Sequence, residues 1–213
     1  MSKDFWLDCW DKGEIRFHQK NINPQLTSFW PNIAKDKKPV FVPLCGKTLD
    51  MTYFAKRGHK VIGVEFSEKA ILEFFSSLQL TPSVQSKGSF NIYEAENYQI
   101  YCGDLFHLDI NLQEIAYVYD RASYIALNEE TRKKYREWLI KHLSHAHILL
   151  LSIEFDNLEA GPPFSISQEE LKEGFSSAYK IETLIDEEID KSKVPHSQII
   201  NQLIERVHKL SPK

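Results

Sequence analysis

An acidic side chain and a glycine turn stand at a separation that suits the binding of a nucleoside. The turn contains Gly46, and the acidic residue, Glu65, follows it by 19 residues. A carboxylate about 20 residues beyond the first glycine turn of a βαβ unit can accept hydrogen bonds from the hydroxyls of a bound ribose. Such bonds are charge-assisted and can use both carboxylate oxygens. We therefore expect Glu65 to hold the ribose of a cofactor.

The residues around this pair predict the elements that position it. An apolar, β-prone run, Val40–Leu44, leads into the turn, and a second apolar run, Val61–Val64, ends at Glu65. Between them lies an amphipathic helical pattern that stops at Gly58. The order strand, glycine turn, helix, strand and acidic residue is typical of the first half of a dinucleotide-type βαβ unit.

The composition of the turn narrows the class of cofactor. Gly46 is its only glycine, so the G-x-G-x-x-G pattern that lets a backbone approach a pyrophosphate is absent. The segment Gly46-Lys47-Thr48 resembles the end of a P-loop, but that motif requires glycine where this chain has Phe41. An adenosine-bearing cofactor without phosphates fits better, and S-adenosylmethionine is the commonest of these.

The remaining pattern alternates between strands and helices, which predicts an α/β fold. Ser67 is typical of an N-cap for a helix reaching about Leu78, and a further helix is predicted over 129–143. The predicted strands after Glu65 are a hairpin of Phe90–Tyr93 with Tyr98–Cys102, then Ile115–Tyr119, His147–Ile153, Tyr179–Ile185 and a final antiparallel strand within Ile199–Val207.

Charged residues follow two of these strands. Asp104 comes after Tyr98–Cys102, and Asp120-Arg121 ends the strand Ile115–Tyr119. Ligands of open parallel sheets bind beyond the carboxyl ends of the strands, so these residues are candidates for the edge of the site. Turn formation by Asp104 and a structural ion pair at Asp120-Arg121 are equally simple interpretations.

The first thirty residues are rich in aromatic side chains. Trp6 and Trp10 are four residues apart and would share one face of a helix. Two interpretations are open: a helix packed on the main sheet, or an N-terminal flap that closes over a ligand together with Phe17.

Bulk properties indicate an ordinary globular chain of one domain, 1–213. The net charge of −4 argues against a nucleic-acid or anionic-membrane binder, and no signal-peptide pattern opens the sequence. Three widely spaced cysteines read as free thiols of a reducing compartment, so we expect a cytoplasmic protein. We expect a monomer and no metal site. A metal site at the histidines near 142–147 would lie away from the expected pocket.

Several local motifs occur together in a recognisable order. They are W-x3-W-x2-G-x3-F-H from Trp6 to His18, Pro43–Lys47, Gly58-His59, Gly63–Glu65, Asp120-Arg121 and Gly161–Phe164. In this combination, which spans about Trp6 to Phe175, the chain resembles the thiopurine S-methyltransferase family. The resemblance implies a Rossmann-like class I methyltransferase with helices on both faces of a mostly parallel sheet. That sheet would have seven strands, the last antiparallel, and residues 1–35 would form a flap covering the cofactor.

The resemblance also implies roles for individual residues. The cofactor-binding set would be Trp6, Trp10, Phe17, Leu44, Glu65, Asp104, Leu105 and Arg121. Leu44 would contact the methionine portion of S-adenosylmethionine, and Asp104 and Leu105 would flank its adenine. Arg121 would lie near the transferring sulfur as the catalytic residue. Phe17, Pro162 and Pro163 would border the acceptor, and S-adenosylhomocysteine would be the product.

The acceptor stays open at this point. The resembled family methylates the sulfur of aromatic or heterocyclic thiols, and its mammalian members place an arginine in a late loop. Here the loop 186–195 offers only Lys191 and Lys193. Small aliphatic thiols, halides and selenium or tellurium species are therefore alternative acceptors. A non-catalytic module that binds S-adenosylmethionine is an alternative of another class.

Overall fold

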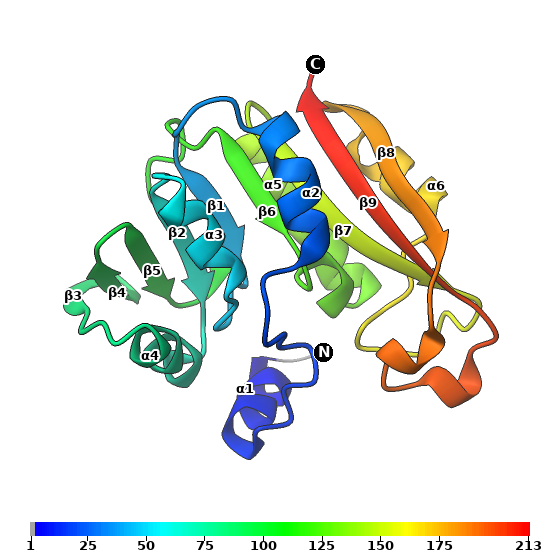
Figure 1. Ribbon diagram of the computed structural model, residues 1–213, viewed down its shortest axis with the longest axis horizontal. Coiled ribbons are helices and arrows are strands. Elements are labelled where there is room, and N and C mark those ends of the chain that lie inside the picture. Colours follow the sequence, from blue (N-terminus) through cyan, green and yellow to red (C-terminus); the bar gives the residue numbers. More distant parts are fainter. Residues whose placement is uncertain (1–2) are drawn as a thin grey trace. The chain divides into compact units, whose positions relative to one another are not determined.

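The computed structural model describes residues 3–213, which group into two compact units. The first unit ends at Val118, and the second runs Tyr119–Lys213. Figure 1 labels their helices and strands. No helix in the described range 3–213 is both long and apolar enough to cross a membrane.

The first unit is built on strands in the order β3-β4-β5-β2-β1-β6. The pairs β2–β5, β1–β2 and β1–β6 are parallel, whereas β3–β4 and β4–β5 are antiparallel. The bounds are α1 Lys3–Lys12, α2 Pro24–Ile33, β1 Val40–Pro43, α3 Asp50–Lys56, β2 Val61–Glu65, α4 Glu68–Ser77, β3 Ser83–Lys87, β4 Phe90–Ala95, β5 Tyr98–Cys102, the 3-10 turn η1 Leu105–His107, and β6 Tyr117–Asp120, whose last two residues belong to the second unit.

Aromatic side chains fasten the helices of this unit. Trp30 of α2 packs against Phe54 of α3 and Tyr117 of β6, with ring centroids 4.5 and 5.5 Å away. Phe74 and Phe75 of α4 pack edge-on against Tyr98 of β5. The side chain of Ser67 accepts a hydrogen bond from the backbone N–H of Ala70, which confirms the predicted N-cap of α4.

The second unit contains three antiparallel strands in the order β7-β9-β8. Its elements are the 3-10 turn η2 Tyr124–Ala126, α5 Glu129–Leu143, β7 His147–Phe155, α6 Gln168–Phe175, β8 Tyr179–Glu188, the 3-10 turns η3 Lys191–Lys193 and η4 Ser197–Ile199, and β9 Leu203–Pro212. The final strand is antiparallel as predicted. It begins later than expected because Ser197–Ile199 forms a 3-10 turn.

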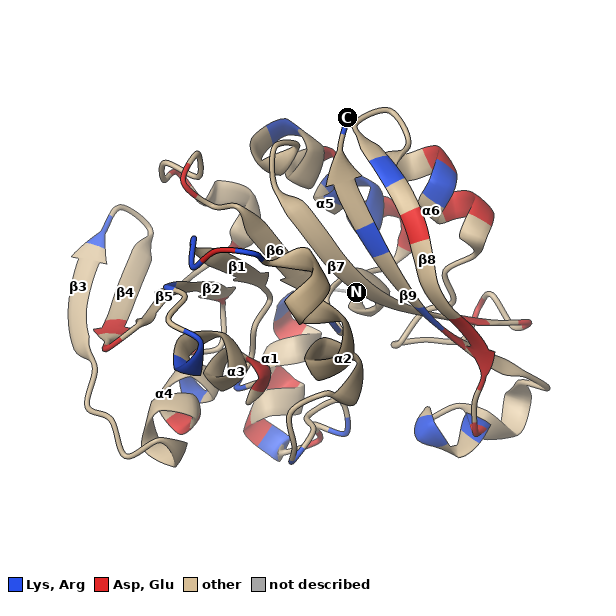
Figure 2. Ribbon diagram, turned by 45° about the horizontal axis from the view of Figure 1, so that its top comes forward, with Lys and Arg blue, Asp and Glu red and all other residues tan. Residues whose placement is uncertain are grey.

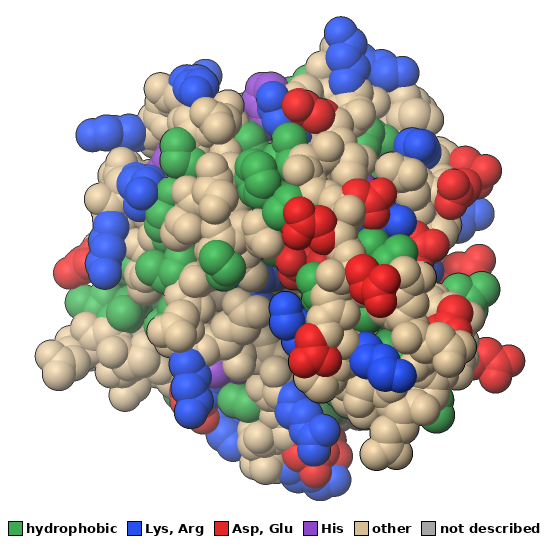
Figure 3. Space-filling model, turned by 45° about the vertical axis from the view of Figure 1, so that its right-hand side comes forward, with side chains coloured by type: hydrophobic (Ala, Val, Ile, Leu, Met, Phe, Trp, Pro, Cys, Tyr) green, Lys and Arg blue, Asp and Glu red, His purple; other side chains and the backbone are tan. Residues whose placement is uncertain are grey.

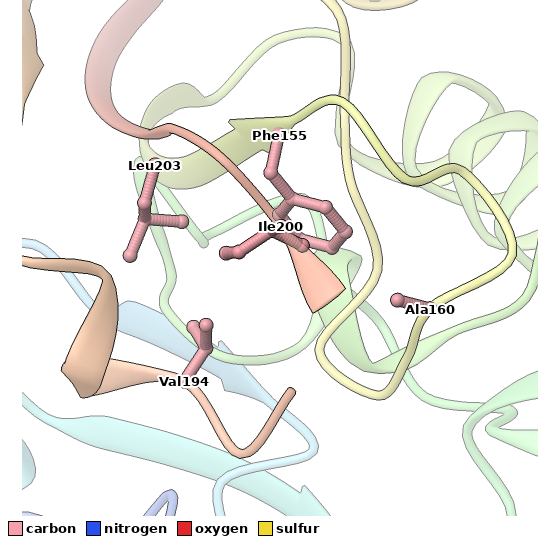
Figure 4. Close-up of a cluster of buried hydrophobic side chains, with 5 residues drawn as sticks. All are labelled: Phe155, Ala160, Val194, Ile200 and Leu203. Carbon is pink, nitrogen blue, oxygen red and sulfur yellow. The ribbon is translucent and has the colours of Figure 1, made fainter. Parts of the chain in front are cut away.

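A cluster of buried apolar side chains anchors the loop between β8 and β9. The cluster consists of Phe155, Ala160, Val194, Ile200 and Leu203 (Figure 4). Lys191 donates a hydrogen bond from Nζ to the carbonyl oxygen of Ile200, 2.8 Å away, across the same loop. Lys191, one of the two lysines in the loop 186–195, is therefore engaged in holding that loop.

The predicted α/β class is confirmed, but the strand count of seven is wrong for the described residues. Nine strands are present. The main addition is β3, whose five residues are all exposed. An edge strand without a buried face carries no alternation of apolar and polar residues, so it lacks the signal on which strand prediction depends.

Candidate functional site

The turn after β1 adopts a backbone that few residues favour. Leu44 has φ +45° and Gly46 has φ +50°. A non-glycine residue at positive φ is uncommon and persists only where its surroundings hold it. The N–H of Cys45 donates to the carbonyl oxygen of Val64 at 3.0 Å, which ties the turn to the end of β2. Gly46 also has no room for a side chain, because a Cβ there would meet the Trp10 ring at 2.9 Å.

Glu65 closes this turn from the end of β2. Its Oε2 accepts a hydrogen bond from the N–H of Gly46, and its Oε1 accepts one from the N–H of Ser67, both at 2.9 Å. The side chain is 4% exposed. Burial raises the pKa of Glu65, while the backbone N–H groups of Ser67, Gly46 and Phe66 oppose that rise. The predicted glycine–acid pair is thus a direct contact.

Three aromatic residues of the N-terminal segment pack together beside the turn. Trp6 and Trp10 lie on α1, and each contacts the ring of Phe17 edge-on, with centroids 5.6 and 5.4 Å away. Trp10 is buried, and Lys47 Nζ stands 5.9 Å from the centroid of its ring. Lys47 also pairs with Glu73 at 2.6 Å. The predicted i, i+4 pair on one helix is confirmed.

The end of β5 adds two of the predicted residues to this group. Cys102 of β5 pairs with Glu65 of β2, and Gly103 donates its N–H to the carbonyl oxygen of Glu65 at 2.9 Å. Asp104 accepts a hydrogen bond from the N–H of Phe106 at 3.0 Å and caps η1. Leu105 is buried. Asp104 is therefore the turn former that one interpretation expected, and it also lies at the carboxyl end of β5.

In the second unit, Asp120 is fully buried at the end of β6. It accepts hydrogen bonds from the hydroxyl of Tyr135 at 2.6 Å and from the N–H of Tyr124 at 3.0 Å. Burial raises the pKa of Asp120 to about 6, although these donors oppose the rise. Arg121 follows directly and precedes Ala122, whose φ is +62°. The turn that carries Arg121 is thus held by the Asp120 carboxylate.

The Gly161–Phe164 segment lies against the same turn within the second unit. The N–H of Phe164 donates to the carbonyl oxygen of Ile125 at 2.7 Å, four residues beyond Arg121. The Phe164 ring covers Gly161, where an added Cβ would meet it at 2.3 Å. Pro162 and Pro163 are half-buried in this loop, and both peptide bonds preceding them are cis.

The predicted site residues therefore form two groups, one in each unit. The first unit brings together Trp6, Trp10, Phe17, Leu44, Glu65, Asp104 and Leu105. The second unit brings together Arg121, Pro162 and Pro163. Two lysines also lie at the first group: Lys47, part of the Pro43–Lys47 motif, stands beside Trp10, and Lys69, which carried no sequence signal beyond its charge, bonds to α1.

The chain is similar over its whole length to one family of enzymes. The model of the family described as thiopurine S-methyltransferase matches residues 1–213. The chain belongs to this family. It is 39% identical over 216 residues to a probable thiopurine S-methyltransferase of Yarrowia lipolytica, with 99% of this chain and 100% of the relative covered. It is 37% identical over 215 residues to a thiopurine S-methyltransferase of Pseudomonas fluorescens, with 99% of each covered.

A solved structure supports the fold of this thiopurine S-methyltransferase family member. It is the 1,6-didemethyltoxoflavin-N1-methyltransferase of Burkholderia thailandensis with bound 1,6-didemethyltoxoflavin and S-adenosylhomocysteine. The TM-score is 0.62 at 12% identity, and the match covers 98% of this chain and 86% of that chain. The expected Rossmann-like class I methyltransferase fold is confirmed.

Proposed function

We propose that this protein transfers the methyl group of S-adenosylmethionine to the sulfur of an aromatic or heterocyclic thiol, as a single catalytic domain, 1–213. The observation that carries the proposal is the Glu65 carboxylate, bonded across the β1 turn at the end of a parallel strand. The names of the relatives support a thiopurine as the acceptor.

The residues of the first unit fit an adenosine-bearing cofactor. A carboxylate offers about four lone-pair positions, and the hydrogen bonds from the N–H groups of Gly46 and Ser67 use two of them. The remaining positions suit ribose hydroxyls. In this proposal Glu65 holds the ribose, Asp104 and Leu105 flank the adenine, and Leu44 contacts the methionine portion. Trp6, Trp10 and Phe17 cover the cofactor.

The bound cofactor supplies a methyl group on a positively charged sulfur. The aromatic faces of Trp10 and Phe17 tolerate such a cation and exclude water from it. Arg121 favours the thiolate form of the acceptor, because a nearby positive charge lowers the pKa of an acid. Phe17, Pro162 and Pro163 align the acceptor. Positioning of this kind can lower a barrier by up to ~7–11 kcal/mol in ideal cases.

The proposal is tested by transfer of a labelled methyl group. A thiopurine, an aliphatic thiol, selenite, tellurite and iodide are offered separately to the purified protein with labelled S-adenosylmethionine. We expect the fastest transfer to the thiopurine. Faster transfer to iodide or to a selenium or tellurium species would replace the proposed acceptor. Stable binding of the cofactor without transfer to any of them would indicate a non-catalytic binding module.

The same assay tests the expectation that no metal takes part. We expect the rate to be unchanged by EDTA, since methyl transfer between aligned partners requires no Lewis acid. A loss of activity with EDTA that is restored by a divalent ion would contradict this expectation. A cytoplasmic location and a monomeric state also belong to the proposal, and size-exclusion chromatography with light scattering checks the latter.

A further inference from the structure

The C-terminal end of α1 is held by a lysine from a distant part of the sequence. Lys69, in the first turn of α4, donates from Nζ to the carbonyl oxygens of Trp10 at 2.9 Å and Asp11 at 3.1 Å. The last carbonyls of a helix have no partner within that helix and carry its negative dipole end. The Lys69 ammonium supplies both a donor and a positive charge at these carbonyls, and it fastens the end of α1 to the start of α4. Figure 1 labels both helices.

The segment held by Lys69 covers the predicted cofactor turn. The Trp10 ring, on the residue whose carbonyl Lys69 binds, lies within 2.9 Å of the position of a Cβ on Gly46. Glu65, bonded to Gly46, is only 4% exposed. A ribose cannot reach the carboxylate while it is covered to this extent. The covering groups must therefore move before a cofactor enters.

Glu65 and Lys69 are joined through the start of α4. The N–H of Ser67 donates to Glu65, and the Ser67 side chain caps α4 by accepting from Ala70. Lys69 lies in the same helical turn, two residues after the N-cap Ser67. The carboxylate and the lysine that holds the cover are thus fixed to the same helix end, and a shift of one is transmitted to the other.

We propose that Lys69 is a positioning residue that latches α1 over the β1 turn and thereby sets how fast the adenosine cofactor enters and its product leaves. The latch is suited to repeated opening because its two bonds end on backbone carbonyls and the Lys69 side chain is exposed. Water can replace those bonds at once when the segment lifts. This inference rests on the proposed function.

The test compares three variants of the full chain. Lys69→Met keeps the length of the side chain and removes the charge, Lys69→Arg keeps both donors and charge, and Lys56→Met removes a lysine from the last turn of α3. The dissociation rate of S-adenosylhomocysteine is measured by surface plasmon resonance. Hydrogen exchange of the backbone amides of residues 6–12 is measured with and without this ligand.

We expect Lys69→Met to release S-adenosylhomocysteine at least about tenfold faster, the scale expected for the loss of a hydrogen bond from a charged group. Exchange of residues 6–12 should quicken by a similar factor in the free protein. Lys69→Arg should restore both quantities to within about twofold, and Lys56→Met should change neither. Melting temperatures of all variants establish that the fold is retained.

An unchanged dissociation rate and unchanged exchange in Lys69→Met would overturn the proposal. Equal effects in Lys69→Met and Lys56→Met would also overturn it, because the change would then reflect charge alone. If calorimetry finds no binding of S-adenosylhomocysteine to the wild-type protein, the proposed function fails instead. The exchange of residues 6–12 in the free protein then decides by itself whether Lys69 holds α1.

Discussion

Glu65 combines a structural and a proposed binding role in one side chain. It closes the β1 turn through Gly46 and Ser67, and the same oxygens are the proposed acceptors for ribose hydroxyls. Substitution at this position should therefore lower both the stability of the first unit and its affinity for cofactor. A binding measurement without a stability measurement would not separate the two.

Glu65→Gln keeps the shape of the side chain and loses its charge. We expect the affinity for S-adenosylhomocysteine to fall by about 1.5–3 kcal/mol, the scale of a hydrogen bond to a charged group. Isothermal calorimetry measures the affinity, and urea denaturation measures the free energy of unfolding. Glu114→Gln, which changes an exposed glutamate, is the control. Unchanged affinity in Glu65→Gln would remove Glu65 from the ribose site.

The hydroxyl of Tyr135 donates a hydrogen bond to the buried Asp120 carboxylate. In Tyr135→Phe the carboxylate loses this hydrogen bond. The bond opposes the rise in the pKa of Asp120 that burial causes, so its loss should raise that pKa further. We expect the free energy of unfolding at neutral pH to fall by about 1–3 kcal/mol, because a buried charged acceptor is left less satisfied.

Tyr53→Phe is a matched control for Tyr135→Phe. The Tyr53 hydroxyl is buried and has no hydrogen-bond partner in the described part of the chain. Its removal should cost little stability, because the Arg57 guanidinium packs 3.5 Å from the centroid of the Tyr53 ring and a phenylalanine ring keeps that contact. Urea denaturation of both variants measures the difference. Equal destabilisation of the two would mean that the Asp120 contact contributes nothing specific.

At the scale of elements, β9 carries a buried histidine that makes the stability of the second unit depend on pH. His208 lies within hydrogen-bond distance of Ser152 on β7 and Thr183 on β8, both at 3.3 Å. Burial first, and then the charges of Arg206 and Lys172, lower its pKa to about 4, whereas Asp186 raises it. The unfolded chain binds a proton at His208 near pH 6.5.

Between these two values the unfolded state binds more protons than the folded state. Stability contributed by neutral His208 is therefore complete above about pH 6.5 and is lost as the pH falls toward about 4. We expect a loss of up to about 3 kcal/mol over this window, and a flatter profile in His208→Gln. Urea denaturation at several pH values measures both. Parallel profiles would exclude His208 as the cause.

Elements and contacts could be predicted from the sequence where neighbouring residues determine them, and could not where distant residues do. Ser67 and the glycine–acid pair were predictable because a cap, a turn and the end of a strand are set by neighbouring residues. The positive φ of Leu44 could not be predicted, because leucine has no preference for that conformation and tertiary contacts impose it. Lys69 reaches carbonyls 58 and 59 residues away, a contact that no local pattern contains.

At the scale of the whole molecule, binding of ligand and stability are linked. A ligand that binds only the folded state should stabilise this protein by ~2.7 kcal/mol at a hundredfold excess over its dissociation constant. The face drawn in Figure 3 presents many acidic side chains beside lysines and arginines, in keeping with the net charge of −4.

Hydrogen exchange tests where that stabilisation acts. We expect amides from Trp6 to Phe17 to exchange more quickly in the free protein than with S-adenosylhomocysteine, because the bound cofactor adds contacts to those that Trp6, Trp10 and Phe17 already make. Amides of Val61–Val64, in the centre of the sheet, should be protected in both states. Equal protection of residues 6–17 with and without ligand would identify α1 as static packing and end its role as a flap.

The strands β3 and β8, which end the strand orders of the first and the second unit, affect how the protein associates with itself. An edge strand offers unpaired N–H and C=O groups to any other strand, which is how many proteins begin to aggregate. The edge strand β3 consists of five exposed residues that are mostly polar, and it ends in Lys87. Polar and charged residues on an edge strand disfavour pairing with another chain. β8 is interrupted between Thr183 and Ile185 and ends in the acidic residues Asp186–Glu188, drawn red in Figure 2. Like charges would face each other if two β8 strands paired in parallel and in register, so this arrangement disfavours the stacking of identical strands on β8.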